Sequence, residues 1–124
     1  MMEPQRPYDL EERLIDFASE MIDLVEQLPD TRVGNHIADQ VLRSGTSPAP
    51  QYGEAQSAES RNDFVHKMKL GLKELRETKV WLTIVQRKHL IAASPKIDSL
   101  LKECDELIRI FAKSISTAES GQQS

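Results

Sequence analysis

Few residues in this chain combine the types and the spacing that catalysis requires. Di-iron helical bundles use Glu-x-x-His pairs that converge on the core, and the nearest match here is a single Asp63-x-x-His66. A nucleophilic enzyme needs a serine or cysteine beside a base, whereas Cys104 occupies an apolar position of a helical pattern and is expected to be a small core residue. His36 and His89 fall near expected helix ends, and the sequence has no glycine-rich phosphate loop. The sequence therefore predicts no enzyme activity, no cofactor and no metal site.

One group of cations has the spacing to grip a phosphate backbone without reading bases. Lys69, Lys73 and Arg76 share one face of an expected helix, and Arg87 falls in line further along. These four are the candidate nucleic-acid-binding residues. In a monomer, the simpler interpretation is a solvated face whose cations pair with acids of the first helix. In a ring, the same stripe would repeat into a basic band.

Arg43 is a candidate for a structural ion pair. It stands beside the apolar pair Val41 and Leu42 and just before a hydroxyl-rich segment. A guanidinium held there needs a carboxylate, and Glu54 and Glu74 are the candidate partners. The alternative is an arginine whose stem packs against apolar neighbours while its head reaches water.

Composition favours a helical protein with a core of its own. The chain has 124 residues, of which 39% are apolar, 29% are charged and only 5% are aromatic. That balance is typical of a globular domain rather than a disordered chain, and the few aromatic, Gly and Pro residues argue against an all-β fold. The length predicts a single domain, residues 1–124, that needs no disulfide or metal to fold.

The net charge of −4 argues against an arm that coats nucleic acid indiscriminately, but the charges are unevenly divided. Residues 8–28 contain seven acids and one base, whereas residues 61–89 contain eight bases and three acids. Opposite charge on two helices favours their docking and also leaves a local basic surface. The single cysteine suits a reducing compartment. With no apolar signal core and no run long enough for a membrane span, the expected location is the cytoplasm.

Apolar residues recur at three- and four-residue spacing in four segments, which predicts four helices at about 9–28, 31–59, 61–89 and 95–117, with flexible tails at 1–7 and 118–124. Short connections place consecutive helices antiparallel. The predicted fold is therefore an all-α, up-down-up-down four-helix bundle. The expected core positions are Leu10, Leu14, Phe17, Met21, Leu24, Leu28, Val33, Ile37, Val41, Leu42, Phe64, Met68, Leu72, Leu75, Leu82, Ile97, Leu100, Leu101, Cys104, Leu107, Ile108, Phe111 and Ile115.

The second helix contains a segment that disfavours regular helix. Pro48 and Pro50 each remove a backbone donor and restrict the residue before them. Two interpretations remain: one helix kinked at residues 46–50, or two short helices joined there. A kink is favoured, since the hydroxyls of Ser44, Thr46 and Ser47 could satisfy the carbonyls that the prolines free.

The third helix carries a second apolar stripe in addition to its core stripe. Leu70, Trp81, Ile84 and Val85 lie about 100° or more away from the core positions. A helix in a simple monomeric bundle needs only one stripe. The second stripe predicts a neighbouring subunit, with these four residues as the candidate oligomer interface.

Several short motifs, taken in order, resemble a known family. They are Arg43-Ser44-Gly45-Thr46-Ser47, Glu54-Ala55, Ser60-Arg61-Asn62-Asp63-Phe64, and Lys73-Glu74-Leu75-Arg76-Glu77-Thr78 leading to Trp81-Leu82. Together they are similar to the four-helix-bundle proteins first noticed in intervening sequences of 23S ribosomal RNA genes. The resemblance covers roughly residues 14–111.

The resemblance implies a homopentameric ring of four-helix bundles. It also implies kinship with accessory variability proteins of diversity-generating retroelements, which bind reverse transcriptase and nucleic acid through basic surfaces. This chain departs from the family in its acidic net charge and in Pro48 and Pro50, which stand where many relatives carry apolar or small residues.

Together these observations favour a non-enzymatic, oligomeric interaction or assembly protein without a membrane segment. The alternative is weak, sequence-independent binding of RNA or DNA, or an accessory role beside a nucleic-acid enzyme such as reverse transcriptase.

Overall fold

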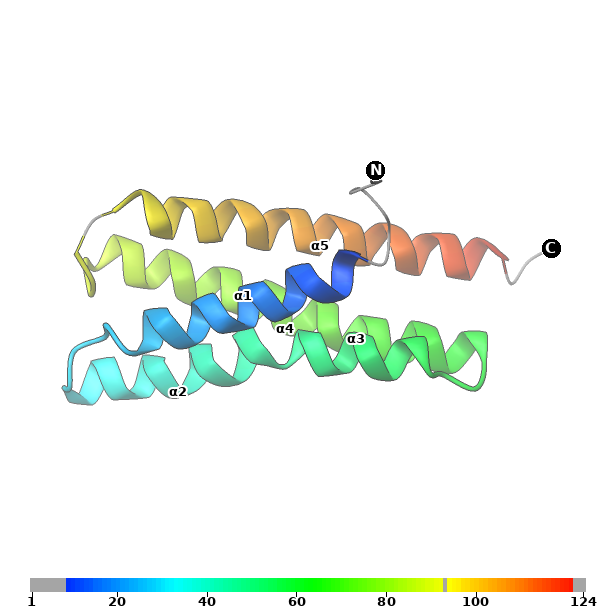
Figure 1. Cartoon of the computed structure of the whole chain (residues 1–124), viewed down its shortest axis with the longest axis horizontal. Helices are drawn as coiled ribbons and strands as arrows, with labels where there is room; N and C mark the ends of the chain where they lie inside the picture. Colours follow the sequence, from blue (N-terminus) through cyan, green and yellow to red (C-terminus); the bar gives the residue numbers. More distant parts are fainter. Residues whose placement is uncertain (1–8, 93, 122–124) are drawn as a thin grey trace.

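The computed structural model describes residues 9–92 and 94–121, and within them the chain is helical throughout its regular structure. The helices are α1 (Asp9–Val25), α2 (Arg32–Thr46), α3 (Pro48–Gln56), α4 (Arg61–Arg87) and α5 (Pro95–Gly121). In Figure 1, α2 and α3 follow one another along a single line, and consecutive rods run in opposite directions. The prediction of an all-α four-helix bundle with a kinked second helix is confirmed.

Capping residues define where the helices start. Thr31 has an extended backbone, and its hydroxyl accepts a hydrogen bond from Gly34 N at 3.0 Å. Ser60 caps α4 in the same way through Asp63 N, also at 3.0 Å. Both bonds satisfy a backbone donor that a first helical turn leaves without a partner.

The helix ends differ from the predicted ones because the last turns tighten. Hydrogen bonds from Leu28 N to Val25 O and from Gln27 N to Leu24 O close shorter rings, so α1 ends at Val25 rather than residue 28. The second rod ends at residue 56 and α4 at residue 87, each before its predicted end. His89 then takes a φ of 53°, and Leu90 N bonds Val85 O at 3.0 Å, which closes α4 with a Schellman-type cap.

The predicted tails are only partly described. α5 continues to Gly121, beyond its predicted end at residue 117, so residues 118–121 are helical; their predicted flexibility stays a prediction. Residues 1–8 and 122–124 lie outside the described part of the chain.

The four rods surround one apolar core. α4 packs on α2, α3 and α5, whereas α1 packs on α2, α3 and α5, and no described Cα atom of α1 lies within 8 Å of one of α4. The two helices α1 and α4 therefore occupy opposite corners of the bundle. The largest fully buried apolar side chains come from every rod, and they include Leu14, Phe17, Met21, Val41, Met68, Leu75, Leu82, Leu107 and Phe111.

Two predicted core positions on α2 are wrong. Val33 and Leu42 are 57% and 41% exposed. Each lies next in sequence to a residue on the buried face, Gly34 or Val41, and a step of one residue turns the helix by about 100°. Ile37 and Val41 are buried as predicted, whereas Leu28 is only partly buried beyond the end of α1.

The kink between α2 and α3 is a helical path with missing hydrogen bonds. Ser47 has helical dihedral angles, and Gln51 N reaches Ser47 O at 3.1 Å, so the chain continues through the junction. The hydroxyls do not reach the carbonyls that the prolines free, and that part of the prediction is wrong. Thr46 Oγ1 donates to Leu42 O at 2.5 Å and Ser47 Oγ to Arg43 O at 2.6 Å, a pattern that bends helices.

A buried pair of hydroxyls joins α2 to α4 beside this kink. Ser44 and Thr78 are both fully buried, and their hydroxyl oxygens lie 2.9 Å apart. Thr78 Oγ1 also lies 2.8 Å from Glu74 O. Each hydroxyl has one hydrogen, so both bonds form when Thr78 donates to the carbonyl and Ser44 donates to Thr78. Both buried hydroxyls, Ser44 of α2 and Thr78 of α4, therefore have hydrogen-bond partners.

No helix within residues 9–92 and 94–121 combines the length and the apolar composition that crossing a membrane requires.

Candidate functional site: a basic groove between α4 and α5

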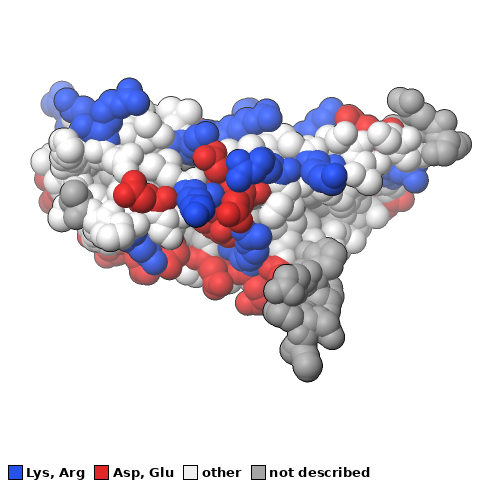
Figure 2. Space-filling view, turned by 90° about the horizontal axis from the view of Figure 1, so that it is seen from above, with Lys and Arg blue, Asp and Glu red and all other residues white. Residues whose placement is uncertain are grey.

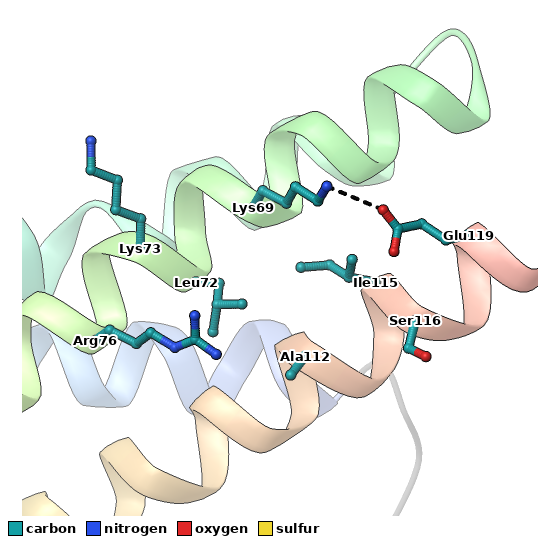
Figure 3. Close-up of a pocket in the computed structure, with 8 residues that line it drawn as sticks. All are labelled: Lys69, Leu72, Lys73, Arg76, Ala112, Ile115, Ser116 and Glu119. Carbon is teal, nitrogen blue, oxygen red and sulfur yellow. Dashed lines mark ion pairs between the residues drawn. The ribbon is translucent and has the colours of Figure 1, made fainter.

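An open groove of about 430 Å³ between α4 and α5 carries predicted site residues. Its floor is apolar and is formed by Leu72, Ala112 and Ile115, whereas its rim is polar (Figure 3). The complete lining is Lys69, Leu72, Lys73 and Arg76 from α4 with Ala112, Ile115, Ser116 and Glu119 from α5.

Helical spacing explains the groove. Lys69, Lys73 and Arg76 follow one another at intervals of four and three residues, so they fall on the side of α4 that Leu72 turns toward α5. On α5, Ala112 and Ser116 lie four residues apart and present only small side chains. The space that larger side chains would fill is therefore left open.

One ion pair joins the walls of the groove, and two of its cations have no ion pair with a described residue. Lys69 Nζ lies 3.1 Å from Glu119 Oε2 (Figure 3), and Lys79 Nζ lies 2.7 Å from Asp105 Oδ1 elsewhere on the same helix pair. Neither Lys73 nor Arg76 has an ion pair with any described residue. Such cations keep their full charge available to an anion.

The unpaired side chains point differently. In Figure 3, Arg76 extends toward Leu72 and Ala112 over the floor, whereas Lys73 extends away from the groove. The apolar floor and the guanidinium together suit a ligand that is both anionic and partly apolar, because an arginine can pack its stem while its head binds an anion.

Three of the four predicted nucleic-acid-binding residues line this groove, and the fourth does not. Arg87 stands on the last turn of α4, about 16 Å further along the helix axis than Arg76. Figure 2 looks onto the molecule from above: Lys and Arg gather over the upper part of the view, while Asp and Glu dominate its lower edge. On the face shown, basic residues are therefore concentrated toward one edge and acidic residues toward the other, with both kinds between them.

Arg43 has one predicted partner and one that the sequence did not predict. Its Nη1 lies 2.8 Å from Glu74 Oε1, and its Nη2 contacts Glu77. Glu54 was the wrong partner, because it lies beyond the kink on α3 and faces Lys67 Nζ at 3.6 Å. The Arg43 side chain is 46% exposed, so its ion pairs are surface bridges worth about 0–1 kcal/mol each.

The predicted oligomer interface on α4 is largely used inside this chain. Val85 is fully buried, so its assignment to an outward face is wrong. Trp81 and Ile84 are half-buried against the core, and the Trp81 ring meets His36 of α2 with 5.9 Å between centroids. Only Leu70, 37% exposed, stands clear of the core. At Trp81 the second stripe of α4 packs against α2.

A cluster that joins α1 to α5 was not predicted from the sequence. Arg13 makes two parallel hydrogen bonds to Glu103, Nε to Oε2 at 2.9 Å and Nη2 to Oε1 at 2.8 Å, and Nη2 also reaches Glu106 Oε1 at 2.9 Å. The hydrogen bond to Glu103 is the main cause that raises the pKa of Arg13 above its usual value. The available signal was that Arg13 is the one base in the acidic first helix.

The comparisons with known proteins agree with this fold. Residues 8–113 match the family model of the 23S rRNA-intervening sequence protein. The chain belongs to this family. A crystal structure of a protein of unknown function from the S23 ribosomal protein family of Bacteroides thetaiotaomicron VPI-5482 resembles it with a TM-score of 0.78 and 29% identity. That likeness covers 86% of this chain and 97% of the other. No curated protein matches the chain.

In this member of the 23S rRNA-intervening sequence family, Asp63 lies in a helix cap, His66 on the surface and Cys104 in the core. Asp63 Oδ2 accepts from Glu59 N at 3.4 Å beside the α4 cap, and His66 is exposed. Burial raises the pKa of the Cys104 thiol to about 12, far from the range of a reactive thiolate. Among the described residues, no three His, Cys, Asp or Glu side chains gather as metal ligands would.

Proposed function

We propose that this protein is a non-enzymatic, homo-oligomeric interaction or assembly module of the cytoplasm. The observation that carries the proposal is the outer face of α1, where Ile15 and Ile22 are 44% and 46% exposed one above the other, seven residues apart. Large aliphatic side chains aligned on one outer face favour a protein contact. Five subunits is the number that the family resemblance implies.

Light scattering after size exclusion at micromolar concentration tests this proposal. The expected mass is a whole multiple of the chain mass, with five as the proposed multiple. Assembly should weaken as salt increases if charged surfaces take part in it. A monomer at every concentration up to the high micromolar range would contradict the proposal.

A second candidate function is sequence-independent binding of RNA or DNA, alone or beside a nucleic-acid enzyme such as reverse transcriptase. The supporting observation is the pair of unpaired cations, Lys73 and Arg76, next to Lys69 in the groove. Arg87 would extend the contact along α4. Such binding depends on counterion release, so its affinity falls steeply with salt.

Reversing two of these charges provides the test. Lys73→Glu with Arg76→Glu should weaken binding of a labelled RNA duplex and reduce the slope of log affinity against log salt by about 2, one unit for each lost phosphate contact. Arg109→Glu with Lys113→Glu is the matched control on the exposed side of α5. No measurable binding of the wild-type protein at low salt would exclude this candidate.

A further inference from the structure

We propose that the subunits associate head to tail, with the acidic outer face of α1 in one copy docked in the basic α4–α5 groove of the next copy. This inference rests on the proposed assembly function and names its two surfaces. The acidic face consists of Ile15, Ile22, Asp16 and Asp23, all of them exposed.

The acidic face of α1 has no partner inside the chain. Asp16 and Asp23 form no ion pair with any described residue. Two other charged residues of the same helix behave differently, since Glu20 bonds Lys96 Nζ at 2.7 Å and Arg13 bonds α5. The charges that hold α1 to the bundle are therefore distinct from those that face outward.

The groove is complementary to this face in charge and in polarity. The face presents a row of isoleucines beside a row of carboxylates, and the groove presents an apolar floor beside two unpaired cations. α2 also exposes Val33 and Leu42, but Asp39 is the one acid within its length. Among the described helices, α1 alone combines exposed aliphatic residues with several acids that have no ion pair with a described residue.

The spacings also match. Asp16 and Asp23 are seven residues apart, as are Ile15 and Ile22. The basic rim of the groove also spans seven residues, from Lys69, which Glu119 already holds, through Lys73 to Arg76. At 1.5 Å per residue, each separation is about 10.5 Å along its helix. One placement of α1 along the groove can therefore bring both carboxylates to its basic rim while both isoleucines meet its floor.

The two surfaces cannot meet within one molecule. α1 and α4 lie at opposite corners of the bundle, and Figure 2 shows acids along one edge with bases toward the other. A contact between different surfaces of identical chains is heterologous, and it generates a closed ring or an open filament. The arrangement would give Lys73 and Arg76 of the groove acidic partners, which they lack within the described part of a chain whose net charge is −4.

Charge reversal tests the contact from both sides. One variant carries Asp16→Lys with Asp23→Lys, and the other carries Lys73→Glu with Arg76→Glu. Each should lose assembly and scatter as a monomer at a concentration where the wild type is oligomeric, because like charges then face each other. Arg109→Glu with Lys113→Glu should keep the wild-type mass. Circular dichroism checks that every variant is folded, as expected for exposed positions.

Restoration gives the sharper result. An equimolar mixture of the two reversed variants should again form species larger than a monomer, because the face of each variant then fits the groove of the other. A closed ring of five cannot alternate two variants throughout, so the expected species are heterodimers and larger open or even-numbered assemblies. A single chain with all four substitutions should assemble by itself, since its face and groove have exchanged signs. These two results would not follow from a general effect of net charge.

The outcomes separate the possible failures. If the wild type assembles and both reversed variants keep its mass, the head-to-tail contact is wrong while the assembly function stands. If assembly is lost in each variant but restored in neither the mixture nor the fourfold variant, the two surfaces do not meet. If the groove variant loses only RNA binding, the groove is a nucleic-acid surface. A monomeric wild type would overturn the assembly function itself.

Discussion

Replacing Phe111 with alanine should lower the free energy of unfolding by about 3–5 kcal/mol, the range for a large buried aromatic residue. Phe111 is fully buried on α5. Its ring lies 6.2 Å from that of Tyr52 on α3 and rests against Gly71 of α4, where an added Cβ would approach the ring to 2.6 Å. The side chain therefore joins three helices, and its removal leaves a cavity that none of them can close alone.

Urea denaturation followed by circular dichroism measures this loss. Phe64→Ala is the matched control, because Phe64 is only half-buried on α4 and its truncation should cost about 1–2 kcal/mol. Equal losses at the two positions would contradict the view that the ring of Phe111 organises the core.

Gly34→Ala should cost roughly 2–3 kcal/mol, toward the upper end of the range for overpacking. A Cβ at residue 34 would lie 2.0 Å from the carbonyl oxygen of Pro29 and 3.0 Å from a carbon of its ring. The obstacle is mainly backbone, so no rotamer change relieves it. The turn between α1 and α2 would have to open, which also disturbs the cap that Thr31 provides.

Gly53→Ala is the control for the effect of glycine itself. Residue 53 lies within α3, and an added Cβ there would meet nothing within 4 Å. Alanine should raise stability at this position by about 0.5–1 kcal/mol, since it restricts the unfolded chain and favours helix. The thermal and urea midpoints of unfolding should fall below the wild-type values in Gly34→Ala and rise above them in Gly53→Ala. Destabilisation by both would mean that steric contact with Pro29 is not the cause at residue 34.

The sequence was most informative where a helix has one apolar stripe. On α1 and α5 every predicted core residue is buried or half-buried, because each helix packs with one side toward the bundle and the pattern records that side. On α2 the pattern was misleading. Its buried face includes Ser44 and Gly45, and a Cβ on Gly45 would come within 2.5 Å of Met21. Close approach of two helices selects small residues, which leave no hydrophobic signal.

The sequence predicted the part of the groove that lies on α4, but not the part that depends on the packing of α4 against α5. Spacing along α4 was enough to place Lys69, Lys73 and Arg76 on one side of a helix. Spacing could not show that α5 lies against that side, that Glu119 neutralises Lys69, or that Lys73 and Arg76 stay unpaired. Those properties depend on how α4 and α5 pack, which brings together residues as far apart in the chain as Lys69 and Glu119.

Apolar periodicity, capping residues and prolines are local features that extend over a few residues. They were therefore sufficient to predict the helices, their number and the position of the kink. Pairing between distant residues was not accessible in this way. Arg13 meets Glu103 ninety positions later, Val85 is fully buried, and Trp81 packs against His36 of α2, more than forty positions earlier. Such contacts depend on which helix faces pack together. Several faces have similar polarity, so local spacing alone does not determine the pairing, and only the packing of the core does.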